Sequence, residues 1–258
     1  MNSSRREQIR ELLCNRPFIS FDELHEMFPG VSNMTLRRDI EYFEEQSEAI
    51  KVRGGARSMK FITTCMEGKF SLRMNENTPA KQKIASVALS LIETERSVFL
   101  DSGTTIFQLA ATMPDERLVV TTTGPNIALE LIKKKLPIVN LVGGMLNRDS
   151  ISVSGNNATK FLADINIDVA FIVPSGASAE TGFTCGNYAE CEFKRQVIEK
   201  ARRTIILADY SKFGRTLPYT FAEFGMVDTI ITDRAVSGDI ADAAKRAGTQ
   251  IIAADIGE

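Results

Sequence analysis

Apolar residues in the first sixty positions recur at the spacing of short amphipathic helices. One face of the opening segment carries Ile9, Leu12 and Leu13, and a later segment carries Leu36, Ile40 and Phe43. Between them, the capping-box pattern of residues 20–23 precedes a second short helix, and residues 29–30, Pro-Gly, form a turn. Residues 50–56 indicate a strand that ends in two glycines. This order predicts a winged helix-turn-helix over residues 1–58.

Beyond residue 80, short apolar runs rich in β-branched residues alternate with helical patterns. The runs cover residues 98–100, 118–122, 138–142, 169–173, 204–208, 229–232 and 250–253. Helical patterns lie between several of them, at residues 81–92, 106–111, 126–134, 190–201 and 239–247. Strands buried on both faces that alternate with helices predict a largely parallel α/β sheet. We therefore expect an α/β domain over residues 80–258, with residues 59–79 as a connector containing a strand near residues 61–65.

Composition and charge add limits to this picture. Hydrophobic residues make up 43% of the 258 residues and charged residues 25%, which is ordinary for a globular protein. The formal net charge is -2, so the overall charge does not indicate that the protein binds nucleic acid. A small DNA-reading domain can still concentrate its cations on one face. The sequence contains no signal peptide or membrane-spanning run, which predicts a cytoplasmic protein without a membrane partner. With one histidine, His25, and four cysteines without C-x-x-C spacing, we expect neither a metal site nor a cofactor.

The start of the third predicted helix has the chemistry of a DNA recognition helix. Ser32 is a natural N-cap, and the side chains near it can contact base edges or phosphates. Met34 could touch a thymine methyl group or pack inward. The alternative is that Arg37 and Arg38 are only solvent-exposed residues of a surface helix. The candidate DNA-binding residues, with the cationic hairpin included, are Ser32, Asn33, Thr35, Arg37, Arg38, Arg53, Gly54 and Gly55.

Three strand ends of the α/β domain carry glycine- and hydroxyl-rich loops. Ligands of open α/β sheets bind beyond the carboxyl ends of the strands, and a helix N-terminus after such a loop suits a phosphate. A simple helix cap formed by Asp101 or Ser102 is the alternative for the first loop. Together the loops predict a site for a small phosphorylated polyol. The residues concerned are Asp101, Ser102, Gly103, Thr104 and Thr105 in the first loop, Thr122 in the second, and Gly143 and Gly144 in the third.

These motifs, taken in order, resemble the DeoR family of bacterial transcription regulators. The N-terminal signature S-x-x-T-[IVL]-R-R-D followed by R-G-G-A is matched by residues 32–39 and 53–56. The motifs L-D-x-G-T-T, L-x-G-G, D-x-A-F, G-x-T and A-D-x-S-K-F follow at residues 100–105, 141–144, 168–171, 182–184 and 208–213. The resemblance implies a sensor domain related in fold to ribose-5-phosphate isomerase. It also implies inducer-response roles for Arg73, Lys81, Asp209 and Lys212, although Lys81 could equally be an exposed lysine on a helix face.

Two departures from the family pattern concern the identity of the effector rather than its class. The usual asparagine after Val-Thr is Thr123, with Asn126 three residues later, and residues 173–176 replace a commoner glycine-rich loop. Lys194, on the helix after residues 182–184, is a further candidate contact for the effector. The effector site is thus expected to comprise the three loops together with Lys81, Lys194, Asp209 and Lys212.

The leading hypothesis is a repressor of a sugar-catabolism operon that a phosphorylated sugar releases from double-stranded operator DNA. Symmetric half-sites call for a homo-oligomer, a dimer or tetramer, and the connector would transmit the response. The alternative hypothesis is a sugar-phosphate isomerase, in which Asp101 or Asp168 could serve as the general base. The sequence suggests no compact group of carboxylates and a lysine like that of such isomerases, so we expect that the protein is not an enzyme. A third hypothesis keeps DNA binding and makes the α/β domain a purely structural oligomeriser.

Overall fold

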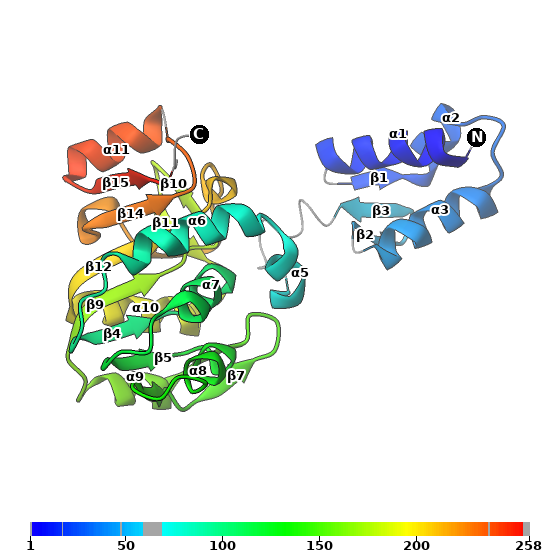
Figure 1. Cartoon of the computed structure of the whole chain (residues 1–258). Helices are drawn as coiled ribbons and strands as arrows, with labels where there is room; N and C mark the ends of the chain where they lie inside the picture. Colours follow the sequence, from blue (N-terminus) through cyan, green and yellow to red (C-terminus); the bar gives the residue numbers. More distant parts are fainter. Residues whose placement is uncertain (1, 17, 47, 59–68, 237, 255–258) are drawn as a thin grey trace. The chain divides into compact units, whose positions relative to one another are not determined.

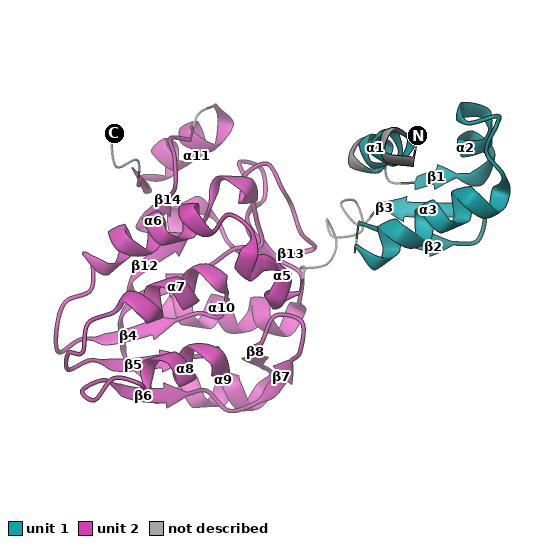
Figure 2. Cartoon of the chain, turned by 45° about the vertical axis from the view of Figure 1, so that its right-hand side comes forward, with its two compact units in different colours: residues 1–66 teal, residues 67–258 magenta. Residues whose placement is uncertain are grey.

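The computed structural model describes residues 2–16, 18–46, 48–58, 69–236 and 238–254. The chain divides into two compact units, residues 1–66 and 67–258 (Figure 2). The strand expected near residues 61–65 lies outside the described residues. Within the range expected to be a connector, the structure places helix α5 (Phe70–Asn75) and the start of α6 (Thr78–Leu89). The boundaries at residues 58 and 79 stay predictions.

Unit 1 is a three-helix domain closed by a small antiparallel sheet (Figure 1). Its elements are α1 (Asn2–Asn15), β1 (Phe18–Ser20), α2 (Phe21–Met27), α3 (Asn33–Glu45), β2 (Ala49–Val52) and β3 (Gly55–Ser58). The apolar faces expected from the sequence meet in one core, where Ile9, Leu36, Ile40 and Phe43 are fully buried. The winged helix-turn-helix prediction is confirmed.

Side-chain caps begin both helices of the helix-turn-helix. The Ser20 hydroxyl accepts a hydrogen bond from Glu23 N at 3.0 Å, and the Ser32 hydroxyl accepts one from Thr35 N at 3.3 Å. Each cap satisfies a backbone donor that the first turn of a helix leaves free. These local bonds explain why the sequence located both helix starts.

Unit 2 is built on a seven-stranded parallel sheet with the order β15-β14-β12-β9-β4-β5-β6. The sheet strands are β4 (Ser97–Leu100), β5 (Val119–Thr122), β6 (Ile138–Leu141), β9 (Ile167–Ile172), β12 (Ala201–Leu207), β14 (Thr229–Thr232) and β15 (Gln250–Ala253). Each of the seven apolar runs forms one strand, so the predicted parallel α/β sheet is confirmed. The chain adds β5 and β6 on one side of β4 and the later strands on the other, which makes the β4–β9 junction a topological switch point.

Two apolar layers cover the sheet. Alternation along β4 sends Val98 and Leu100 to one layer and Phe99 to the other. The first layer contains residues of α6, α7 (Thr104–Thr112) and α8 (Pro125–Leu131), and the second contains residues of α9 (Asn156–Leu162), α10 (Tyr188–Lys200) and α11 (Asp239–Ala247). None of the described helices is long and apolar enough to cross a membrane.

Several short elements of unit 2 escaped the sequence analysis. They are the hairpin β7 (Met145–Asn147) and β8 (Ser152–Ser154), the antiparallel sheet of β10 (Gly176–Ser178), β11 (Gly182–Cys185) and β13 (Tyr219–Ala222), and the 3-10 turns η1 (Tyr210–Lys212) and η2 (Phe224–Met226). Each has only three or four residues, too few for a periodic pattern. The hairpin follows Gly143-Gly144 and stands beside the carboxyl end of β6.

Candidate nucleic-acid interface and candidate effector site

The solvent-facing side of α3 presents Asn33, Met34, Arg37 and Arg38. Met34 is 64% exposed, which places it on the outer surface and rules out the inward packing considered from the sequence. Asn33 Oδ1 lies 2.5 Å from His25 Nε2 of α2, so α2 also helps to orient the Asn33 side chain. The Ser32 and Thr35 hydroxyls lie 2.9 Å apart at the cap. The first turn of α3 is therefore held in shape while its outer side chains face solvent.

Ion pairing separates the arginines of unit 1 into two groups. Arg5 and Arg6 pair with Asp39, Arg10 with Glu48, and Arg16 with Glu23, so these cations serve the fold. By contrast, within the described part of unit 1, the exposed arginines of α3 and of the β2–β3 hairpin form no ion pair; they are Arg37, Arg38, Arg53 and Arg57. Arg57 was not among the sequence candidates.

This sorting matters because the unit has no net charge. Residues 1–66 contain ten basic and ten acidic residues, so the whole domain offers no general attraction for nucleic acid. Its uncompensated cations instead stand on the two elements that a winged helix uses to contact DNA, the recognition helix and the wing.

Asp39 closes the R-R-D motif but faces the opposite way from the arginines. It is buried, and it accepts hydrogen bonds from Arg5 Nε at 2.6 Å and Arg6 Nε at 2.8 Å. The carboxylate thereby ties α1 to the middle of α3. The motif combines two outward cations with one inward anion that fixes the helix they stand on.

The two glycines of the wing have different reasons to be glycine. Gly54 has φ +89° in the two-residue turn between β2 and β3, with open space around it. Gly55 is buried in β3, where a Cβ would lie 2.1 Å from the carbonyl oxygen of Ile19. The expectation that Gly55 contacts DNA is therefore corrected: close approach of β1 requires this glycine.

In unit 2, the predicted loops gather at one edge because parallel strands end on the same side. Asp101 follows β4 and Val173 follows β9, the two strands that meet at the switch point. Thr122 ends β5, Gly143 follows β6, and Asp209 follows β12. The sheet thus brings these loops to the place where open α/β sheets bind ligands.

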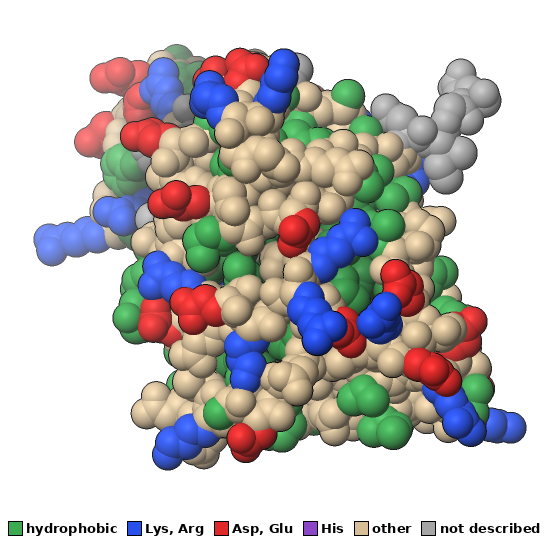
Figure 3. Space-filling model, turned by 90° about the vertical axis from the view of Figure 1, so that its left-hand side faces the viewer, with side chains coloured by type: hydrophobic (Ala, Val, Ile, Leu, Met, Phe, Trp, Pro, Cys, Tyr) green, Lys and Arg blue, Asp and Glu red, His purple; other side chains and the backbone are tan. Residues whose placement is uncertain are grey.

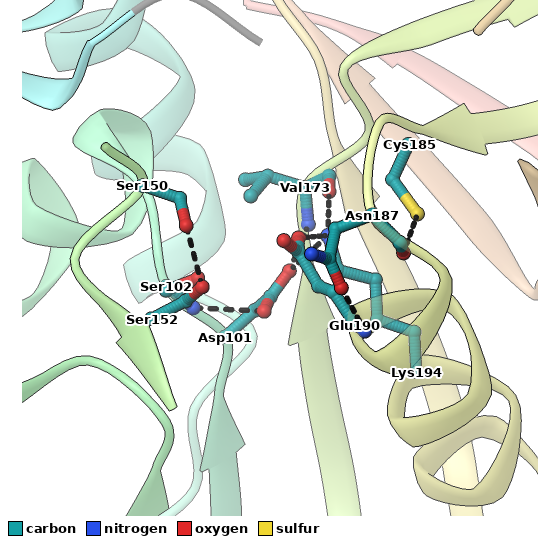
Figure 4. A network of polar contacts seen from close by, with 9 residues as sticks. All are labelled: Asp101, Ser102, Ser150, Ser152, Val173, Cys185, Asn187, Glu190 and Lys194. Atoms are coloured by element: carbon teal, nitrogen blue, oxygen red, sulfur yellow. Dashed lines mark hydrogen bonds and ion pairs between the residues drawn. The ribbon is translucent and has the colours of Figure 1, made fainter. Parts of the chain in front are cut away.

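A buried ionic network occupies the switch point (Figure 4). Lys194 Nζ of α10 lies 3.0 Å from Asp101 Oδ2 and 2.9 Å from Glu190 Oε1, and it donates a hydrogen bond to Val173 O at 2.7 Å. Asp101 also accepts from Ser102 N at 2.8 Å and Val173 N at 3.0 Å. Asp101 and Lys194 are thus held by the protein itself, so they shape the loop and are not free for direct contact with an effector.

The network corrects one statement made from the sequence. A compact carboxylate–lysine constellation does exist, formed by Asp101, Lys194 and Glu190. The other proposed base, Asp168, lies near the amino end of β9, where it accepts from Ser97 N at 3.0 Å. Asp101 and Asp168 therefore sit at opposite ends of the sheet and cannot act on one substrate.

The loop between β4 and α7 leads into an uncapped helix start. Gly103 is the N-cap of α7, and no side chain bonds to the free N–H groups of its first turn. The cap alternative for Asp101 or Ser102 is thus wrong. Gly103 has φ +137°, and a Cβ there would lie 2.8 Å from Val173 Cγ2. Ser102, Thr104 and Thr105 are buried around these N–H groups, an arrangement suited to an anion.

The other loops contribute backbone shape. Thr122 is fully buried, and its hydroxyl accepts from Gly124 N at 3.0 Å, so it forms the turn and is not an open contact. Gly143 and Gly144 are exposed, and a Cβ on Gly144 would lie 2.7 Å from Ser154 O of β8. Sequence reasoning missed Ser150 and Ser152, whose buried hydroxyls lie 2.6 Å apart on the Ser102 side of the network (Figure 4).

The last motif and the start of α6 meet in a second polar cluster. Asp209 is buried, and its Oδ1 accepts from Asn77 Nδ2 at 3.2 Å and Ser211 N at 3.1 Å. Lys81 is also buried and donates to the carbonyl oxygens of Arg73 and Glu76, the latter at 2.5 Å. The alternative of an exposed Lys81 is therefore wrong.

Electrostatics link Lys81 to the other residues of this cluster. Burial lowers the pKa of Lys81, the charge of Asp209 opposes this shift, and Lys212 and Arg73 add to it. Lys212, in η1, is half-buried. Three of the residues implied by the family resemblance, Arg73, Asp209 and Lys212, thus act on the pKa of the fourth, Lys81.

Unpaired polar atoms also gather toward the carboxyl ends of the strands. Among the described residues, the buried side-chain atoms without a hydrogen-bond partner are Thr121 Oγ1, both polar atoms of the Asn126 amide, Asp209 Oδ2 and Thr232 Oγ1. Asn126 follows β5, Asp209 follows β12, and Thr232 ends β14. Because buried polar groups normally have partners, this concentration points to a ligand.

The opposite edge of the sheet carries a pocket of another kind. It is lined by residues at the amino ends of β9 and β12, including Arg96, Asp168 and Arg202. Arg96 pairs with Glu93, and Arg202 with Asp168. Figure 3 shows this face, on which cationic and anionic side chains are interspersed. Arg203 also lines this pocket and donates a hydrogen bond to Thr229 Oγ1 at 3.5 Å. The buried polar atoms without partners among the described residues lie instead toward the carboxyl edge, which is the candidate effector site.

Comparison with known proteins agrees with the two-unit architecture. Residues 5–61 match the model of the DeoR-like helix-turn-helix domain, and residues 76–234 match that of the DeoR C terminal sensor domain. The chain is 31% identical to the putative aga operon transcriptional repressor of Escherichia coli O157:H7, over 97% of this chain and 93% of that protein. It is 33% identical to the transcriptional repressor GlcR of Bacillus subtilis, over 86% and 85%.

Among solved structures, ribose 5-phosphate isomerase A from Methanocaldococcus jannaschii is similar at 16% identity, over 54% of this chain and 55% of that chain, with a TM-score of 0.40. The relatives identified by sequence are transcriptional regulators and not enzymes. With both family models matched in order and a relative 31% identical over nearly its whole length, the chain belongs to the DeoR family of transcriptional regulators.

Proposed function

We propose that this regulator represses an operon of sugar catabolism and binds its operator as a homo-oligomer through α3 and the β2–β3 hairpin. The observation that carries the proposal is the sorting of cations in unit 1, which leaves Arg37, Arg38, Arg53 and Arg57 uncompensated on these two elements. Two similar proteins, the putative aga operon repressor and GlcR, are named as repressors, which supports the direction of the control.

The proposed effector is a phosphorylated sugar bound at the carboxyl edge of the sheet. The free N–H groups at the start of α7 and the Asn126 amide suit a phosphate, and Asp209 Oδ2 can accept hydrogen bonds from sugar hydroxyls. To release the operator, the effector must bind the DNA-incompetent arrangement more tightly than the competent one, because equal affinity shifts no population.

DNA binding is tested by fluorescence anisotropy with the DNA upstream of the regulated gene. The variant Arg37→Ala/Arg38→Ala should lose about 2–4 kcal/mol of binding free energy, since each arginine contact with a base or phosphate contributes roughly 1–3 kcal/mol. Arg202→Ala/Arg203→Ala removes the same charge from an adjacent arginine pair at the start of β12 and should bind like the wild type. Equal losses in both variants would contradict the proposed interface.

The effector is tested on the preformed complex with DNA. A panel of phosphorylated sugars should lower the anisotropy, whereas the same sugars without phosphate should not. If no member of the panel releases DNA from a protein that binds its operator, unit 2 is not the proposed sensor. That outcome would support the hypothesis that unit 2 serves only to assemble the oligomer.

A further inference from the structure

The sheet of unit 2 ends at an apolar edge with which no further strand of the described chain pairs. The edge strand β6 pairs only with β5 and consists of Ile138, Val139, Asn140 and Leu141, without a charged residue (Figure 2). Natural proteins usually protect such edges with charges, bulges or covering elements, because unpaired N–H and C=O groups invite another strand. An apolar, uncharged edge therefore calls for a partner.

Apolar exposure extends from β6 to the elements that adjoin it along the chain. Eight large apolar residues between positions 119 and 146 are each 40–70% exposed, and we call them the edge patch: Val119, Leu129, Ile132, Leu136, Ile138, Leu141, Met145 and Leu146. They belong to β5, α8, β6 and β7 and to the segment between α8 and β6. Of the three nearby lysines, Lys133 is paired with Glu130, Lys134 donates to Ala110 O, and Lys135 is exposed.

The size of the edge patch matches what a stable dimer requires. The eight exposed fractions together equal about four and a half fully exposed residues, which corresponds to an apolar area on the order of 500 Å². A standard interface takes roughly 800 Å² from each partner, and homodimer interfaces are about 65% apolar, which again gives roughly 500 Å² of apolar surface per copy.

We propose that the edge patch is the surface through which two copies of this chain associate, with β6 beside β6 of the second copy. A strand that pairs with its own copy around a twofold axis does so in the antiparallel sense. Each β6 then offers backbone N–H and C=O groups to the unpaired C=O and N–H groups of the other. The inference deepens the proposed homo-oligomer and rests on it. Because β6 leads directly into Gly143-Gly144, this interface borders the candidate effector site.

Sedimentation velocity on the full chain tests the surface. The wild type should sediment as a dimer or larger, and both Leu129→Lys and Ile138→Lys should shift it to a smaller species, with a dissociation constant raised on the order of 100-fold. The effect is large because each substitution occurs twice in a twofold interface. Met226→Lys is the matched control, since Met226 is 44% exposed but belongs to η2 and not to the edge patch, and it should sediment like the wild type.

The possible failures are distinguishable. A monomeric wild type would overturn both the proposed oligomer and this surface. An oligomeric wild type whose two edge-patch variants assemble unchanged would overturn the surface alone, as would equal disruption by Met226→Lys. Circular dichroism checks folding, and the use of two variants on different elements, α8 and β6, keeps the test decisive if one of them unfolds.

Discussion

Replacing Asp39 by alanine should destabilise unit 1 while replacing its neighbour Arg38 should not. Asp39 is almost completely buried, and its two oxygens bind Arg5 Nε at 2.6 Å and Arg6 Nε at 2.8 Å. Removing one member of a buried ion pair costs roughly 3–5 kcal/mol, because the remaining charge loses its partner. The arginine side chains are 12% and 31% exposed, so water relieves part of this cost and we expect about 3 kcal/mol.

A loss of that size is large for this unit. At roughly 0.05–0.15 kcal/mol per residue, a unit of 66 residues has only about 3–10 kcal/mol of stability. Hydrogen exchange on the full chain, followed in peptides from residues 5–58, measures the opening free energy of unit 1 directly. Asp39→Ala should therefore speed exchange across α1 and α3 together.

Arg38→Ala is the matched control because it lies one position away and is exposed. Its exchange should stay within about 0.5 kcal/mol of the wild type, while its operator affinity falls. Asp39 does not hold α1 against α3 if Asp39→Ala exchanges like the wild type, or if Arg38→Ala opens unit 1 as readily as Asp39→Ala does.

Three further predictions concern the glycines and the lysine of the two sites. Gly103→Ala places a Cβ 2.8 Å from Val173 Cγ2 at φ +137°, so calorimetry should show effector affinity at least about tenfold lower, with operator binding kept; unchanged affinity would contradict the phosphate loop. Gly55→Ala would place a Cβ 2.1 Å from Ile19 O. It should lower the free energy of unfolding of unit 1 by more than the roughly 1 kcal/mol expected where only the backbone conformation is strained. A melting curve like that of the wild type would disprove the close approach. Since burial lowers the pKa of Lys81, its charge is lost at a lower pH than that of an ordinary lysine, whose pKa is 10.5. Effector affinity should thus fall as pH rises toward 10. Lys81→Met should flatten this profile, whereas a flat wild-type profile would remove Lys81 from the site.

The sequence alone located the three helices of unit 1 and the seven strands of the large sheet, in their order along the chain. Leu36, Ile40 and Phe43 recur at helical spacing, and Ser32 bonds to a backbone N–H three residues away, so α3 could be located from its own residues. The seven apolar runs of unit 2 likewise identified the strands of the sheet. These features depend on contacts within a few positions, which is the range over which periodicity carries information.

Only the tertiary structure decided which side chains remain available. Asp101 and Lys194 are 93 positions apart, yet they form one buried ion pair because β4 and β9 are neighbours and α10 packs beside them. Sheet order likewise placed Asp168 at the other end from Asp101, and the packing of α1 against α3 turned Asp39 inward. The ion-pair partners and the burial of these side chains are set by contacts between segments that are distant in the sequence. The spacing of neighbouring residues does not reveal those contacts.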